Sequence, residues 1–238
     1  MPHDRSAHGP ARRSFLSRLA AGAGAFGAAF ASATSVSAQP ARAAAPGFVP
    51  ARHAEDDWFD DTTAGHRFFY DTMTADACGQ ALYFARNFFA ANSSGYKLTD
   101  ADVAQIICLR HASTAFAFTD AMWVKYGAAL SARAGNFLDP KTKQVPTINV
   151  YLASSYGEAL RNVNVTIEQM AKRGVRFAVC GLATRATAQV AAQQTGGNVD
   201  AIVKELTSNL VPNGHMVPVG IVAVSRAQER GYTFAYVD

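Results

Sequence analysis

The chain has 238 residues, of which 49% are hydrophobic and 17% charged, and its formal net charge is +4. Residues 1–38 hold four of the 22 basic and one of the 18 acidic residues, so the remaining chain has a net charge of +1. That part contains no Lys/Arg-rich run, which excludes the electrostatic footprint of a nucleic-acid-binding protein. Its length suits a single domain with a sizeable core.

Residues 1–38 have the composition of a Tat-type signal peptide. Arg12-Arg13 is followed by Phe15 and Leu16, by an Ala/Gly-rich apolar run and by Val36-Ser37-Ala38, a small-residue cleavage site. The apolar run is short and weakly hydrophobic, which disfavours the alternative of a membrane anchor. We therefore expect export by the Tat pathway, a periplasmic mature protein and no stable membrane span after cleavage.

Residues 39–64 are rich in alanine, proline and charged residues and have no sustained helical or strand period. We predict an extended linker. Trp58 and Phe59 lie within its acidic part. Three alternatives are open for this aromatic pair: it pins the linker onto the domain, it pins it onto a neighbouring subunit, or it lies on the surface.

Residues 65–238 predict one domain in which strands and helices alternate. A short aromatic strand over 66–71 precedes an amphipathic helix over 76–91. A strand over 103–109 precedes a helix over 113–126. Apolar residues spread over much of the surface of this second helix, which predicts burial on two sides.

The second half of the domain continues the alternation. We predict strands over 148–152, 175–180 and 232–237, and helices over 167–172, 182–194, 198–210 and 217–230. Pro218 is tolerated in the first turn of the last helix, and Gly231 ends it. Five strands with helical crossovers predict an α/β fold, a flavodoxin-like three-layer sandwich around a mainly parallel five-stranded sheet.

Cys180 is the strongest candidate for a functional residue, because it ends a predicted buried parallel strand. Ligand-binding and catalytic groups gather at the carboxyl ends of such strands. Gly181 lets the backbone approach a ligand, and the amino end of the next helix favours a thiolate, with Arg185 adding positive charge. Two interpretations stay open: a functional thiol and a buried cysteine that does not react.

The chain has two further cysteines outside the signal sequence. Cys108 lies inside a predicted core strand, where a small apolar thiol packs well. Cys78 follows the first strand, at the same edge as Cys180, so it is a possible second thiol or disulfide partner, although the sequence does not give the Cα separation. An odd number of cysteines leaves at least one unpaired within the chain.

Polar residues follow other predicted strands. Arg110 either binds an anionic group or pairs with Asp71 or Asp120. His111 has three possible roles: an acid/base group, a metal ligand and a hydrogen-bonded histidine that holds a loop. Ser154 either provides a hydroxyl that faces a ligand or belongs to a solvated turn.

Metal or haem binding is a weaker alternative. His111, His215 and Met216 would join Cys180 as ligands. The sequence has no CxxC, HExxH or CxxCH motif, so we predict no cofactor. It also lacks a Walker loop, a G-x-G-x-x-G after a strand and a G-x-S-x-G elbow, which leaves nucleotide and esterase functions without a sequence basis.

Three features together resemble the DsrE/DsrF-like family, in particular its exported members. They are the Lys172-x-Gly174-Val175 stretch, the strand that ends at Cys180, and residues 217–220 with 226–233. The resemblance covers about residues 66–238. It implies a flavodoxin-like fold, trimers or hexamers of identical subunits, and a cysteine, matched by Cys180, that carries sulfur as a persulfide.

The first functional hypothesis is therefore an exported thiol/persulfide sulfur carrier, or a sulfurtransferase-like protein, that acts through Cys180. Arg110 and His111 would shape its pocket, and its partners would be a sulfur-donor or sulfur-acceptor protein. The alternative is a non-catalytic periplasmic binding module for a small ligand, metal or haem in the same crevice. An assembly component whose cysteines are all buried is a third possibility.

Overall fold

The computed structural model describes residues 49–238, so the expected signal peptide and the first part of the predicted linker lie outside it. Within the described residues, no helix combines the length and the apolar character needed to cross a membrane.

The centre of the domain is a sheet of five strands in the order β4-β3-β2-β1-β5, and every neighbouring pair is parallel. Their bounds are His66–Thr72 (β1), Val103–Leu109 (β2), Arg176–Cys180 (β3), Gly214–Val217 (β4) and Thr233–Val237 (β5). The predicted α/β class with its parallel five-stranded sheet is confirmed. The three layers are those of flavodoxin-like proteins, although the strand order of flavodoxin itself is 2-1-3-4-5.

The larger core lies on one face of the sheet. This face is covered by the 3-10 helix η3 (His111–Ala117) and by α2 (Ala75–Tyr96), α3 (Asp120–Arg133), α4 (Ile167–Lys172), α5 (Gly181–Thr195) and α6 (Val199–Thr207). Alternate strand residues such as Ile107 and Phe177 point into it. Because helices cover both faces, β2 is buried along its whole length and reads as a nearly continuous apolar run.

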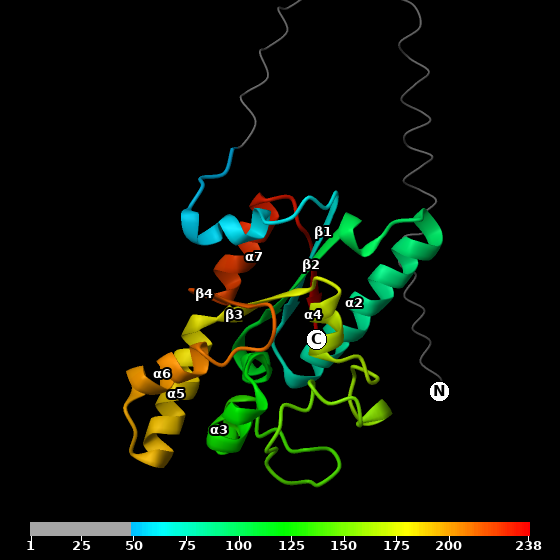
Figure 1. The fold of residues 1–238 in the computed structure, drawn as a ribbon. Coiled ribbons are helices and arrows are strands. Elements are labelled where there is room, and N and C mark those ends of the chain that lie inside the picture. The colour runs from blue at the N-terminus through cyan, green and yellow to red at the C-terminus, as the bar shows by residue number, and fades with distance from the viewer. Residues whose placement is uncertain (1–48) are drawn as a thin grey trace, which may run out of the picture. The chain divides into compact units, whose positions relative to one another are not determined.

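The smaller core lies on the other face, under α7 (Gly220–Glu229) and the 3-10 helix η1 (Ala54–Asp60), which lie beside each other in Figure 1. Phe59 of η1 is fully buried against Phe69 of β1. The second half of the predicted linker is therefore packed on the domain. This agrees with the first of the three alternatives for Trp58 and Phe59, in which the pair pins the linker onto the domain. Two short 3-10 helices, η2 (Asp100–Asp102) and η4 (Gly157–Ala159), complete the regular elements.

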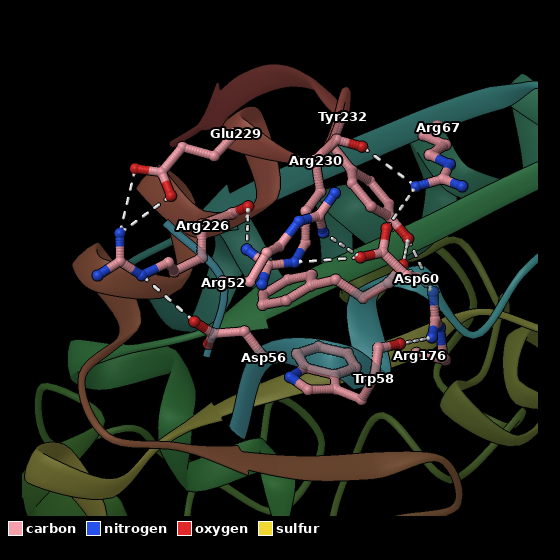
Figure 2. A network of polar contacts seen from close by, with 11 residues as sticks. Arg52, Asp56, Trp58, Asp60, Arg67, Arg176, Arg226, Glu229, Arg230 and Tyr232 are labelled. Carbon is pink, nitrogen blue, oxygen red and sulfur yellow. Dashed lines mark hydrogen bonds and ion pairs between the residues drawn. The ribbon is translucent and has the colours of Figure 1, made fainter. Parts of the chain in front are cut away.

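A network of arginines holds η1 in place (Figure 2). Asp60 forms ion pairs with Arg52, with Arg67 at 3.0 Å and with Arg230 at 3.4 Å. Arg176 donates a hydrogen bond to the carbonyl oxygen of Trp58. The segment is thus attached to β1, β3 and the end of α7 by charge-assisted contacts as well as by burial.

The predicted strand over 148–152 is wrong. These residues form turns, yet Tyr151 is fully buried. The side-chain amide of Asn149 donates to the carbonyl oxygens of Phe116 and Phe118, both at 2.8 Å. Side-chain hydrogen bonds thus supply the partners that a strand ladder would otherwise provide for buried backbone groups.

Two predicted helices also differ from the structure. The predicted helix over 217–230 begins too early, because residues 214–217 pair with β3 and form the edge strand β4. The helix itself, α7, begins only after Pro218. The predicted helix over 113–126 is split into η3 and α3, which are separated near Phe118.

Candidate functional site

A cavity of about 350 Å³ lies where β2 and β3 end and where α5 and α7 begin. This edge of the sheet is where parallel α/β proteins bind ligands. Basic and apolar residues form its wall, and no acidic residue of the described chain is among them. The lining residues are Arg110, His111, Arg133, Cys180, Leu182, Ala183, Ala186, Val219, Gly220 and Ile221.

Cys180 ends β3 and is the N-cap residue of α5. Side chains alternate along β3, and Ala178 belongs to the smaller core, so Cys180 faces α7 as well. The backbone N–H of Gly220, the first residue of α7, donates a hydrogen bond to Cys180 Sγ at 3.3 Å. The amino end of α7 therefore contacts this sulfur directly, whereas the Cys180 side chain forms no capping hydrogen bond with the first turn of α5.

Gly220 allows this close approach. A Cβ atom at this position would lie 2.5 Å from Cβ and 2.9 Å from Cδ of Arg110, so any larger residue would force α7 or Arg110 to move. The sequence placed Gly220 inside a predicted helix and did not identify it as part of a site.

Arg110 pairs with Asp71, which is one of its two predicted acidic partners. Its Nε and a terminal nitrogen contact the two carboxylate oxygens at 2.5 and 2.7 Å, in a bidentate arrangement. Asp71 has a side chain only 3% exposed, against 17% for Arg110. Asp120, the other candidate partner, accepts a hydrogen bond from the backbone of Asn149 instead. The charge of Arg110 is thus compensated, and its stem forms part of the cavity wall.

Arg133 reaches the cavity from the last turn of α3. Its Nε is buried without a hydrogen-bond partner, and no residue between 49 and 238 forms an ion pair with it. His111 is exposed at the cavity and has a φ of 57°, in the left-handed region that non-glycine residues seldom adopt. The uncompensated positive charge of the site is therefore that of Arg133.

Cys108 lies beside the site and is fully buried; its Sγ is 3.8 Å from the carbonyl oxygen of Gly220. Burial raises the pKa of this thiol well above its usual value. Cys108 is opposite Ala178 in the β2–β3 register, two residues before Cys180. Ordinary strand spacing and rise put the Cα atoms of the two cysteines about 8 Å apart, which is too far for a disulfide without backbone movement.

Cys78 does not join the site. It belongs to α2 and to the larger core, whereas Cys180 faces the opposite side of the sheet. Burial also raises the pKa of the Cys78 thiol. All three cysteines are free, so the possible disulfide between Cys78 and Cys180 is not formed.

Two other predicted residues lie outside the cavity. Arg185 is exposed and forms a 2.9 Å ion pair with Asp200 of α6. Ser154 is exposed in the loop that replaces the predicted third strand, and it does not line the cavity.

The structure does not bring together the residues of the metal alternative. His215 and Met216 line a separate cavity, with Trp58, and the His215 ring stacks on Trp58 with a centroid distance of 4.4 Å. Burial and the charge of Arg176 lower the pKa of His215. His111 lines the Cys180 cavity instead. The part of the chain that the structure describes holds no group of three or more His, Cys, Asp or Glu residues suited to a metal ion.

Comparison with known proteins adds little to this geometry. No family model matches the chain, and no curated protein matches it. A solved protein of unknown function, MTH1491 from Methanobacterium thermoautotrophicum, has 13% sequence identity and a TM-score of 0.35, over 72% of this chain and 98% of that chain. The fold assignment depends on the strand pairing described above.

Proposed function

We propose that this protein is a DsrE-like sulfur carrier that acts through the thiol of Cys180. The observation that carries the proposal is the hydrogen bond from the Gly220 N–H, at the amino end of α7, to Cys180 Sγ at the wall of a cavity. Thiolates, not thiols, attack sulfur, and a backbone N–H that donates to Sγ is a suitable partner for the thiolate in such a reaction.

The proposed reaction has two exchange steps. The thiolate of Cys180 attacks the outer sulfur of a donor persulfide R–S–SH, which forms Cys180–S–SH and releases R–S⁻ with the electron pair of the broken S–S bond. An acceptor thiolate then attacks the outer sulfur of this persulfide and regenerates the Cys180 thiolate. Neither step needs a second cysteine of this chain, in agreement with the wide spacing of Cys108 and Cys180.

Several features of the setting belong to the same proposal. The twin-arginine sequence supports export to the periplasm by the Tat pathway. A donor or acceptor protein would meet Leu182 and Ile221, two apolar residues beside Cys180 that are 62% and 55% exposed. The resemblance to DsrE-like proteins supports a trimer or hexamer of identical subunits.

The proposal is tested by mass spectrometry of the native exported protein after exposure to polysulfide. We expect one added sulfur atom on the peptide that contains Cys180. Cys180→Ser should lose the adduct, whereas Cys108→Ser should keep it, because Cys108 is fully buried and burial raises the pKa of its thiol. Intact wild-type protein without an adduct at Cys180 would exclude the sulfur-carrier function.

A non-catalytic binding module is the second candidate, and the low exposure of Cys180, at 5%, favours it. Five apolar residues line the same cavity, as in many small-molecule sites. If this function holds, a small ligand should bind equally well to wild-type protein and to Cys180→Ser. A sulfur carrier instead requires the thiol. Metal and haem content of the freshly isolated protein would test the metal alternative directly.

A further inference from the structure

We infer that the sulfur donor of this site is a small organic persulfide with a negatively charged group, such as a carboxylate. This inference rests on the proposed function and adds the substrate class to it. It follows from the charge of the cavity wall, from its volume and from the positions of Arg133 and Cys180.

The charge of the wall favours an anion. Arg110 is compensated by Asp71, whereas Arg133 has no acidic partner among residues 49–238 and a buried Nε without a hydrogen bond. A guanidinium without an acidic partner attracts an anion, and a carboxylate matches its planar, forked donors best. The amino ends of α5 and α7 add positive potential at the same cavity.

The volume and the apolar walls favour an organic molecule over a bare inorganic anion. About 350 Å³ corresponds to the volume of roughly ten water molecules. Leu182, Ala186, Val219 and Ile221 offer carbon surface that an oxyanion cannot use. Each methylene group buried against such a surface strengthens binding about fourfold.

The two ends of the ligand are assigned by the residues that they would meet. A carboxylate at Arg133 leaves the sulfane sulfur to reach Cys180, since both side chains line the one cavity. The Cys180 thiolate then forms a bond to the outer sulfur, the S–S bond of the donor breaks, and the thiolate R–S⁻ departs. The new negative charge forms on the inner sulfur of the donor, the carboxylate of the leaving group is the end that lies beside Arg133, and no oxidant or reductant is consumed.

The test compares two donors of similar length and opposite charge, the persulfides of 3-mercaptopropionate and cysteamine. We expect the carboxylate donor to persulfidate Cys180 at least about tenfold faster, as the gain of one charge-assisted hydrogen bond implies. Thiosulfate, which has charge but no carbon body, should react more slowly than the carboxylate donor.

Three variants show whether Arg133 is the cause. Arg133→Gln should remove most of the preference, and Arg133→Lys, which keeps the charge, should retain part of it. Arg185→Gln is the matched control, because Arg185 pairs with Asp200 outside the cavity. Equal rates for the two donors, or a preference unchanged in Arg133→Gln, would overturn the inference and leave the proposed function in place.

A binding measurement tests the anionic pocket independently of sulfur transfer to Cys180. Calorimetry with Cys180→Ser and the unreactive 3-(methylthio)propionate should detect binding that Arg133→Gln weakens about tenfold. Such binding, together with a wild-type protein that accepts no sulfur from either donor or from polysulfide, would support the anionic pocket and exclude the sulfur-carrier function. Absence of binding would count against the pocket itself.

Discussion

Replacement of Gly220 by alanine should destabilise the protein, although alanine is the better helix former. The new methyl group would lie 2.5 Å from Cβ of Arg110, closer than any real contact. Arg110 cannot simply swing away, because both of its hydrogen bonds to Asp71 would break. Overpacking of this kind costs about 1–3 kcal/mol.

The helix propensity of alanine recovers less than about 1 kcal/mol of that cost. We therefore expect Gly220→Ala to lower the free energy of unfolding by about 1–2 kcal/mol, measured by urea denaturation. A domain of this size should then lose about 2–4 °C in melting temperature per kcal/mol. Because α7 is pushed outwards, the hydrogen bond to Cys180 Sγ should lengthen, and alkylation of Cys180 should change in rate.

Gly95→Ala provides the matched control. Gly95 lies in α2, and an added Cβ would meet no atom within 4 Å. The same chemical change should here stabilise the protein by up to about 1 kcal/mol. The two substitutions thus have opposite predicted signs. Equal stability of the two variants, with unchanged alkylation of Cys180, would refute the close approach of α7 to Arg110.

Three further predictions concern the Asp71–Arg110 ion pair, the ion pairs of Asp60 and the packing of Phe59 in η1. Asp71→Asn leaves Arg110 without its charge partner and should cost about 3 kcal/mol by urea denaturation, at the low end for a buried pair; a loss below about 1 kcal/mol would contradict the pairing. Partial burial acts to raise the pKa of Asp60, but hydrogen bonds from two arginines outweigh it and lower that pKa. The stabilisation by Asp60 is therefore complete above the pKa that this group has in the unfolded chain, and it is lost as the pH falls through its lower pKa in the folded protein. Acid should therefore change Trp58 fluorescence in the wild type but less in Asp60→Asn. Phe59→Ala should cost about 3–5 kcal/mol, or release η1 to proteolysis, whereas an unchanged stability and protease resistance would deny its anchoring role.

Sequence patterns predicted the elements whose apolar residues follow one period and whose ends carry clear signals. The helix over 167–172 matches α4, because Thr166 and Gln169 form a capping box and Gly174 follows the end. The patterns failed for short apolar runs. Residues 148–152 read as a strand because buried strands and buried loops are alike over five residues, and only the hydrogen bonds of Asn149 distinguish them.

Strand β4 was missed for the opposite reason. It has four residues, begins at Gly214 and is followed by Pro218, so its composition favours a turn. Pairing with β3 makes it a strand. This is a tertiary effect, and it explains why the predicted number of strands was right although one of the five was wrongly placed.

The site was predictable where it depends on strand ends. Cys180, Arg110 and His111 line the cavity because β2 and β3 end side by side. Arg185 was expected there too, but helical periodicity turns it away from the positions of Ala183 and Ala186.

The remaining site residues follow from packing alone. Arg133 comes from the far end of α3, and Gly220 contributes an amide hydrogen. The distance in sequence between these residues and Cys180 hides their proximity. A glycine at a helix start and an arginine in a last helical turn are both common, so neither pattern indicates a ligand.

The position of β1 between β2 and β5 has a consequence for biosynthesis. Residue 68 pairs with residue 233, so one side of β1 is an open edge until the ribosome has made nearly the whole domain. Parallel pairing over so long a separation is slow, and unpaired edges invite aggregation. The nascent chain should therefore need chaperone protection of β1 up to the time that β5 emerges, and Cys180 gains its amide contact from α7 only in that same late interval.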